Sequence, residues 1–452
     1  YWDYKFLIAG SGGVLLPVLI WAFANPQFVG RALGVWVRLA LPILALLFLS
    51  PTQAQLLNEI DIPYTRVVLD NGLVVLVHED HSAPMVYVGV QYRVGSRDEP
   101  PGKTGFAHLF EHLMFGKTEN RGLGFHEVVA ETGGMLNGDT DHDRTRYHQL
   151  VPKSALERAL WLEADRMGFF VDALSQEALD KQRGVVQNEK RRWDNRPYAL
   201  GNYHLAEGLY PQGHPYRWLS IGSMQDLEAA SLDDAKNWFR KFYGPSNTVL
   251  IISGDVETDA VLDRIRHYFG RIEPGDPVHR TRINLPVRTH ASYSTMRERV
   301  AKAQLRRAWL APGFVDREAV HAQLATVILG NGATSRLYRA LVKERKLASH
   351  VGFNNFVFEF ASSQLLSVVL HDDADLAEVR AVIDEVIAEF QAQGPSEEEL
   401  QLAKTRVASV VAQNLDHPFG KAEALASGEM YANDASYYKQ RYQWIDTATT
   451  EE

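Results

Sequence analysis

Apolar residues recur along the chain with two different periods. Alternating or continuous apolar stretches predict strands, whereas apolar residues at every third or fourth position predict amphipathic helices. The predicted extended segments are Thr65–Val77 (reversing at Asp70-Asn71-Gly72), Met85–Val94, Met135–Leu150, Thr248–Ser253, Gln304–Trp309 and Phe356–Leu370. The predicted helices are Ala107–Gly116, Phe125–Thr132, Ser154–Phe169, Ser175–Trp193, Ser231–Tyr243, Thr258–Phe269, Val320–Gly330, Ser335–Glu344, Asp375–Gln393 and Ser396–Leu415. Groups of strands with helices between them indicate a mixed α+β fold.

The pattern restarts after a proline-bearing stretch, Pro274–Pro286, and this predicts two homologous αβ repeats. Met224–Asp234 aligns with Tyr442–Glu452, each placing a hydroxyl residue before an acidic first turn. Further elements follow only the first copy, so we expect the second repeat to be truncated by roughly 50 residues. The expected divisions are a leader at 1–54, a first repeat at 60–275, a linker at 276–290 and a second repeat at 291–452.

The first 54 residues differ from the rest of the chain. The apolar run Leu39–Leu49 follows Arg31 and Arg38 and leads to a small-residue exit at Ala54. This pattern is typical of a secretory signal peptide, and as a helix the run would rise only about 16 Å, too short to span hydrocarbon comfortably. We expect cleavage after Ala54, with an uncleaved anchor as the alternative. Phe6–Ala24 is either a membrane segment or, as we favour, sequence upstream of the true start.

The composition limits which partners and which kinds of functional site the chain can have. The chain has 47 Lys and Arg against 56 Asp and Glu, a net charge of -9, and no basic run, so we expect no nucleic-acid partner. It has no cysteine, which excludes disulfides, thiol catalysis and cysteine-bound zinc. Any metal must therefore be held by histidines and carboxylates.

A metal site of this kind is indicated by the segment His108-Leu-Phe-Glu111-His112, which lies on a predicted helix. Residues advance about 100° each along a helix, so His108, Glu111 and His112 share one face. Two imidazoles one turn apart can bind one Zn²⁺, and the adjacent carboxylate can take a proton from the water that zinc activates. The alternative is an ordinary surface cluster, but apolar residues surround the motif and indicate a buried helix that needs a partner for its polar side chains.

A catalytic zinc needs a third protein ligand. Asp165, Glu177 and Glu189 all lie on predicted helices, and chemistry alone does not choose among them.

From about Thr65 to its end, the chain resembles the insulinase/pitrilysin family of inverted-zincin metallopeptidases, in particular the small bacterial and mitochondrial-processing-type branch. The matching segments are His108–His112, Gly133–Thr140, Asp143–Tyr147, Glu163–Met167, Val185–Glu189, Tyr243–Asn247 and Ser335–Tyr338. The resemblance implies a LuxS/MPP-like metallopeptidase fold, with a mostly antiparallel sheet and packed helices in each repeat. It also implies that Glu189, which follows His112 after 76 intervening residues, is the third ligand of one Zn²⁺ per chain.

The resemblance implies further roles. Asn137, Gly138, Asp139 and Thr140 match the edge segment that pairs with the substrate backbone, and many relatives have Ala where this chain has Gly138. Gln182 stands where relatives often carry a glutamate that supports the third ligand.

Another departure concerns an Arg and a Tyr that self-sufficient relatives use to bind substrate and steady the oxyanion. Val342 and Ser349 stand at those positions, and neighbouring Arg345 lies one helical turn off. Some bacterial relatives receive the pair from a sister subunit, so we expect a heterodimer in which this chain is the zinc-bearing half.

The sequence therefore predicts an exported, periplasmic zinc endopeptidase acting on peptides or unfolded segments. A catalytically silent, zinc-containing scaffold or peptide-binding subunit is the alternative. A membrane enters only if the leader is retained, which would anchor the protein in the inner membrane facing the periplasm.

Overall fold

A computed structural model describes residues 57–278, 283–284 and 287–452. The predicted leader, and with it the expected cleavage after Ala54, lies outside the described residues, as does part of the predicted linker. Among the helices that are described, none is both long enough and apolar enough to cross a membrane.

The first sheet has six strands in the order β1-β2-β6-β3-β5-β4. Its strands are β1 (Thr65–Val68), β2 (Val74–Glu79), β3 (Met85–Tyr92), β4 (Met135–Thr140), β5 (Thr145–Pro152) and β6 (Thr248–Gly254). Every neighbouring pair is antiparallel except β2 and β6. The predicted hairpin around Asn71-Gly72 is confirmed: β1 pairs with β2, and Gly72 takes a φ of +84°, which favours glycine. Strand β4 forms one edge of the sheet.

The extended conformation predicted over Met135–Leu150 is confirmed for most of its length, but it is divided into two strands because the chain reverses between β4 and β5. The side chain of Asp141 makes this turn. Its Oδ1 accepts hydrogen bonds from the backbone N–H groups of Asp143 and Arg144, at 2.7 and 2.9 Å. After the turn, β5 pairs with β4 on one side. Among the described residues, no strand pairs with the other side of β4.

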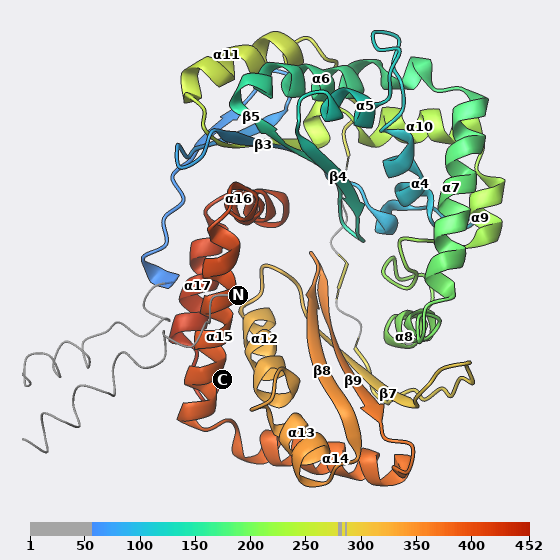
Figure 1. The fold of residues 1–452 in the computed structure, drawn as a ribbon, viewed down its shortest axis with the longest axis vertical. Coiled ribbons are helices and arrows are strands. Elements are labelled where there is room, and N and C mark those ends of the chain that lie inside the picture. The colour runs from blue at the N-terminus through green and yellow to red at the C-terminus, as the bar shows by residue number, and fades with distance from the viewer. Residues whose placement is uncertain (1–56, 279–282, 285–286) are drawn as a thin grey trace, which may run out of the picture. The chain divides into compact units, whose positions relative to one another are not determined.

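Helices cover both faces of the first sheet (Figure 1). One face packs against helices of the same half, which share a large apolar core with it. These helices include α4 (Phe106–Leu113), α6 (Leu156–Ala173), α7 (Gln176–Asp194), α10 (Leu232–Phe242) and α11 (Thr258–Phe269). The other face, at Leu76, Tyr87 and Ile251, packs against Leu425 and Ala426 of α16 (Pro418–Ala432). Shorter helices α5 (Phe125–Ala130), α8 (Gly201–Leu209) and α9 (Met224–Ala229) complete this half.

The second sheet has three antiparallel strands in the order β7-β9-β8. They are β7 (Gln304–Pro312), β8 (Ala348–Val357) and β9 (Ala361–Leu370). The prediction of a single strand over Phe356–Leu370 is wrong, because the chain turns at 358–360. That turn contains no Gly, Pro, Asn or Asp, and it is held by a distant residue: the Glu359 N–H donates to Asp143 Oδ2 at 2.7 Å.

The helices of this half are α12 (Arg317–Gly330), α13 (Arg336–Tyr338), α14 (Leu376–Gln393), α15 (Glu397–Leu415), α16 and α17 (Tyr437–Thr447). The predicted helix Ser335–Glu344 divides into α13 and a π-helical segment, Arg339–Glu344. The sequence analysis placed no helix where α8, α9, α16 and α17 lie. Helix α16 contacts the first sheet on one side and α15 and α17 on others, so apolar residues surround it and the helical period is blurred.

The order strand, helix, hairpin, helix, helix occurs twice along the chain. It runs β3, α4, β4–β5, α6, α7 in the first half and β7, α12, β8–β9, α14, α15 in the second, with a short helix, α5 or α13, before each hairpin. The expected α+β architecture of two related repeats, each with a mostly antiparallel sheet, is therefore confirmed. The exact boundary at residues 276–290 stays a prediction.

Candidate active site and metal centre

Helix α4 carries the His108–His112 motif, and its first turn is fixed by a buried carboxylate. Glu99 Oε1 accepts the Ala107 N–H at 2.8 Å, and Oε2 accepts the Gly105 N–H at 3.1 Å and Trp218 Nε1–H at 2.8 Å. These bonds satisfy backbone donors that a helix start leaves open. Burial raises the pKa of Glu99 to about 8, and the three donors oppose the rise. Glu99 was not predicted from the sequence, because it lies outside the helix that it caps.

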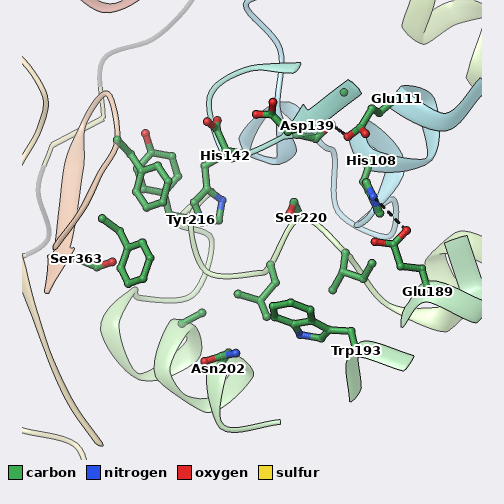
Figure 2. A pocket seen from close by; sticks show the side chains of 18 of the residues that line it. His108, Glu111, Asp139, His142, Glu189, Trp193, Asn202, Tyr216, Ser220 and Ser363 are labelled. Atoms are coloured by element: carbon green, nitrogen blue, oxygen red, sulfur yellow. Dashed lines mark hydrogen bonds and ion pairs between the residues drawn. The ribbon is translucent and has the colours of Figure 1, made fainter. Parts of the chain in front are cut away.

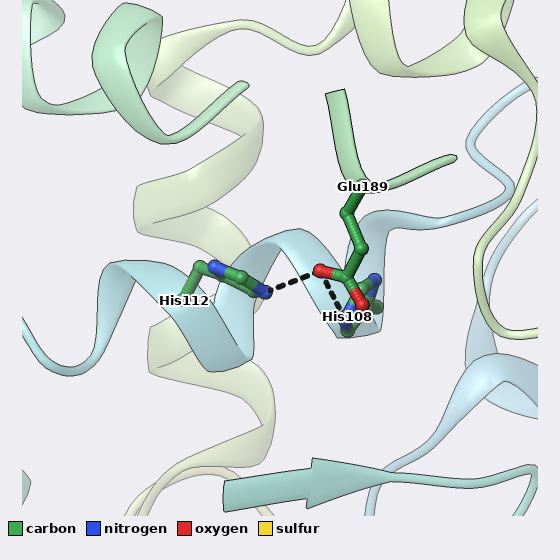
Figure 3. A group of neighbouring side chains, drawn as sticks. All are labelled: His108, His112 and Glu189. Carbon is green, nitrogen blue, oxygen red and sulfur yellow. Dashed lines mark ion pairs between the residues drawn. The ribbon is translucent and has the colours of Figure 1, made fainter. Parts of the chain in front are cut away.

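The two histidines of α4 meet Glu189 of α7 (Figure 3). Glu189 Oε2 lies 3.3 Å from His112 Nε2 and 3.7 Å from His108 Nε2. One potential ligand atom from each residue lies within 4.8 Å of the other two. Donor atoms that share one tetrahedral zinc are about 3.3 Å apart, given bonds of about 2.0 Å. The spacing therefore fits a single metal ion.

The protonation state of the histidines also fits a metal. Burial lowers the pKa of His108 to about 3, with a further contribution from His112. Burial likewise lowers the pKa of His112, although Glu189 opposes this. Both imidazoles are therefore neutral at pH 7, which is the form that binds metal. His108 Nδ1 is buried without a hydrogen-bond partner among the described residues, whereas zinc-binding histidines usually donate this N–H to an acceptor.

Glu111 is held between α4 and the edge strand β4. Its side chain is buried, and its Oε2 accepts a hydrogen bond from Thr140 Oγ1 at 2.7 Å. Burial raises the pKa of Glu111 to about 7, with Asp139 and Glu189 adding to the rise and Thr140 opposing it. Gly138 explains why β4 approaches so closely, since a Cβ there would lie 3.1 Å from Glu111 Oε1 and from the Phe115 ring. An alanine at this position would therefore press against the carboxylate of Glu111.

The other two candidates for the third ligand have different surroundings. Asp165 accepts hydrogen bonds from Thr118, Asn120 and Arg121. Glu177 lies exposed in the first turn of α7, far along the helix from Glu189. Among the three, only Glu189 lies beside the histidines.

A cavity of about 820 Å³ extends from the metal centre to the second sheet (Figure 2). His108, Glu111, His112 and Glu189 line one end. All four predicted substrate-binding residues, Asn137, Gly138, Asp139 and Thr140, line the same cavity. Its remaining wall comes from α8, the segment 216–221 and the second sheet, including Leu209, Tyr210, Tyr216, Ala308, Phe356, Phe358, Ser363 and Leu365. The sequence analysis did not name this second group, whose members are far apart in the chain.

Four residues singled out in the sequence lie away from this cavity. Gln182 is half-buried on α7 and does not line the cavity. Val342 packs against the core of the second sheet, and Ser349 Oγ donates to the Val369 carbonyl at 3.3 Å. Arg345 pairs with Glu385 at 3.0 Å. None of Val342, Ser349 and Arg345 lines the cavity.

Comparison with known proteins places this site in a family. Residues 74–213, which contain the motif and Glu189, match the family described as Insulinase (Peptidase family M16). Residues 229–407 match the Peptidase M16 inactive domain. The zinc protease PqqE of Helicobacter pylori is 32% identical over 301 residues, which are 65% of this chain and 66% of that protein, just under two thirds of its length. An uncharacterized zinc protease of Mycobacterium leprae is 28% identical over 86% of this chain and 87% of its own length.

Solved structures show the same fold. A protease from Helicobacter pylori matches with a TM-score of 0.77 and 25% identity, over 86% of this chain and 95% of that one. The periplasmic protease PqqL from Escherichia coli matches with a TM-score of 0.68 and 18% identity, over 86% of this chain but only 45% of its own. The two family matches together cover most of the described residues, and the relatives are named as zinc proteases. The chain belongs to the insulinase family of zinc metallopeptidases, peptidase family M16.

Proposed function

We propose that this chain is a zinc-dependent endopeptidase in which His108, His112 and Glu189 hold one Zn²⁺. The observation that carries the proposal is the convergence of three ligand atoms within 4.8 Å of one another on buried helix α4 and on α7, with a buried carboxylate one turn away. A site that served only to stabilise the fold would be closed by a fourth protein ligand and would need no base. Among the described residues, only His108, His112 and Glu189 offer ligating side chains grouped at this position.

The bound zinc would supply an activated water and polarise the scissile carbonyl. Glu111 takes the proton of the attacking water and then delivers it to the leaving amine nitrogen, as the C–N bond breaks. Thr140 already donates to Oε2 of Glu111, so we assign this proton to Oε1.

The substrate backbone would pair with β4 along Asn137–Thr140. Strand β4 is paired only with β5, and its other edge faces the cavity that holds Glu111. Pairing through backbone N–H and C=O groups is independent of side chains, so it would accept many sequences. The contact between Thr140 and Glu111 would place the paired peptide next to the base.

We further propose that the chain acts in the periplasm with a sister subunit that supplies an Arg/Tyr pair. Val342 and Ser349 cannot donate as that pair does, and neither lines the cavity. A yeast relative 24% identical to this chain is named as the beta subunit of a mitochondrial-processing peptidase. PqqL, named a periplasmic protease, carries this fold in about half of its length.

A catalytically silent zinc scaffold remains the second candidate. The missing Arg/Tyr pair, the amide at Gln182 and the unpartnered Nδ1 of His108 favour it. The buried position of Glu111 beside the ligands favours the enzyme.

Hydrolysis of a quenched fluorescent peptide library by the zinc-loaded chain separates the two. Glu111→Gln is the inactive comparison, and Glu177→Gln, on an exposed turn of α7, is the matched control. Cleavage by the wild type and by Glu177→Gln, but not by Glu111→Gln, supports the enzyme. Cleavage that appears only after a sister subunit is added supports the heterodimer, and no cleavage under either condition supports the scaffold.

A further inference from the structure

We infer that the end of the cavity beside His142 binds one bulky apolar side chain of the substrate, two or three residues from the scissile bond. This inference rests on the proposed peptidase function and adds a substrate preference to it. The subsite has four ring-bearing residues, here called the aromatic wall: Tyr210, Tyr216, Phe356 and Phe358, all of which line the cavity.

The aromatic wall is assembled from both halves of the chain. Tyr216 stacks on the His142 ring at 4.8 Å, and Phe358 meets the same ring edge-on at 4.8 Å. Phe358 also lies 5.6 Å from Tyr216. Phe356 is 46% exposed although it lines the cavity, so a large apolar surface remains uncovered there. Covering such surface by an apolar group is favourable.

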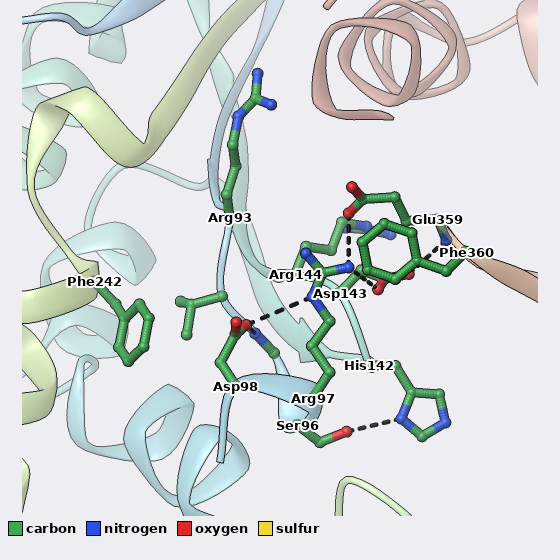
Figure 4. Close-up of polar contacts among 12 residues, drawn as sticks. Arg93, Ser96, Arg97, Asp98, His142, Asp143, Arg144, Phe242, Glu359 and Phe360 are labelled. Atoms are coloured by element: carbon green, nitrogen blue, oxygen red, sulfur yellow. Dashed lines mark hydrogen bonds and ion pairs between the residues drawn. The ribbon is translucent and has the colours of Figure 1, made fainter. Parts of the chain in front are cut away.

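A buried ion cluster holds the aromatic wall in place (Figure 4). Arg97 Nη1 donates to Asp143 Oδ1 and to Glu359 Oε2, both at 2.8 Å. Asp143 accepts hydrogen bonds from the Tyr216 hydroxyl and from the Glu359 N–H. The tip of the β8–β9 hairpin, which carries Phe358, is thereby tied to the end of β4. Because the aromatic wall is already ordered before the substrate binds, little conformational entropy is lost on binding.

The chemistry of this end selects an uncharged occupant. The aromatic wall itself carries no ionised side chain, and the charges behind it on Arg97, Asp143 and Glu359 already pair with one another. The cavity carboxylates nearest this end, Asp139 and Asp141, are likewise paired with Arg146 and Arg144. A charged substrate side chain would therefore lose its water without gaining a partner.

The position of the aromatic wall fixes which substrate residue reaches it. Thr140 contacts Glu111, and His142 follows two residues later and contacts the wall. His142 already lies in the turn after β4, and two residues of chain span at most about 7 Å. The wall therefore lies just past the end of β4, within two to three residue lengths of the base. A peptide paired with β4 therefore presents a residue two or three positions from the cleaved bond.

The test uses the full zinc-loaded chain and two peptides that differ only at that position, Phe in one and Ala in the other. We expect wild type to favour the Phe peptide in kcat/KM by at least about 10-fold, a usual discrimination for a hydrophobic pocket. Phe356→Ala combined with Phe358→Ala should reduce this ratio to near 1. Phe169→Ala, which removes a half-exposed ring on α6, is the matched control and should keep the wild-type ratio. Phe356→Glu should shift the preference toward Lys or Arg.

A binding measurement separates failure of this inference from failure of the proposed function. Fluorescence anisotropy with the Glu111→Gln protein reports the same two labelled peptides without requiring turnover. Cleavage without a Phe preference overturns the aromatic subsite and leaves the peptidase standing. Absence of cleavage, together with a Phe preference in binding that the paired alanine variant loses, supports the subsite and overturns the peptidase.

Discussion

Helices α4 and α12 occupy the same place in the order of elements, each after one strand and before a hairpin. Helix α4 presents two histidines to Glu189 of α7 and Glu111 to strand β4. Helix α12 carries one histidine, His321, whose Nε2 lies 3.8 Å from Glu452 instead. Among the described residues, two groups of three side chains could each bind a metal ion: the candidate metal centre and an exposed group of Glu79, His81 and Glu257. Both lie in the first half. The two halves therefore share a fold, but only the first carries the candidate metal ligands, because such a site depends on a few side chains and not on the fold.

The second half contributes to the site in another way. Its β8–β9 hairpin reaches the end of β4, where Phe356 and Phe358 line the cavity and Glu359 joins the ion cluster of Arg97 and Asp143. The first half thus provides the proposed metal and base, and the second provides a shaped wall. The following variants each change the metal site, the contact between the halves, or the stability of one half.

Removing the third ligand should have the largest effect. We expect Glu189→Ala to lose stoichiometric zinc and all peptide cleavage, because two imidazoles alone do not complete a catalytic zinc site. Metal analysis after dialysis and a cleavage assay measure both. Glu398→Ala, at an exposed position on α15 in the second half, is the control and should keep one zinc per chain. Retention of full zinc by Glu189→Ala would contradict the assignment.

Breaking the contact between the halves should come next. Asp143→Asn replaces a fully buried carboxylate that pairs with Arg97 and accepts from Tyr216 and Glu359. We expect about 3 kcal/mol less unfolding free energy, the lower end for a broken buried pair, because Arg97 keeps Glu359 as a partner. Denaturant unfolding measures the loss, with Asp263→Asn on the surface of α11 as control. A change below about 1 kcal/mol would show that the hairpin tip is not held by this cluster.

Uncapping the metal-bearing helix should have a smaller effect. Glu99→Gln places an amide where two oxygens accept three N–H groups, so at least one donor loses its partner. We expect a loss of about 1–3 kcal/mol in unfolding free energy and weaker zinc binding. Glu131→Gln, on an exposed helix end, is the matched control. Unchanged stability and unchanged zinc affinity together would show that Glu99 does not organise α4.

How much of this could be predicted from the sequence depends on how local each signal is. The motif on α4 is contained in five consecutive residues, so helical geometry alone grouped its side chains. Glu189 was one of three candidates until the family resemblance selected it. Glu99 and the turn at 358–360 were missed because their determinants, Gly105, Trp218 and Asp143, are distant or outside the element concerned. The aromatic wall has no local pattern at all, since its rings come from α8's end, a loop and a hairpin.

The smallest effect concerns a partly exposed pair in the second half. Arg336 donates to both oxygens of Glu399 and lowers the pKa of that carboxyl to about 2, from 4.5. Because the folded pKa is depressed, the stabilisation is complete above pH 4.5 and is lost as the pH falls toward 2. We expect wild type to exceed Glu399→Gln by about 1 kcal/mol or less at pH 6, and by less at pH 3.5. An equal difference at both pH values would contradict this.

The central claim is that the first half holds a catalytic zinc with three protein ligands and an open position. X-ray absorption spectroscopy of the zinc-loaded chain, with Glu189→Ala alongside, tests it most directly. The account predicts two imidazole nitrogens and one carboxylate from the protein, a further ligand that small anions displace, and loss of this signature in Glu189→Ala. A closed shell of four protein ligands that anions do not disturb would contradict the account and identify a structural zinc.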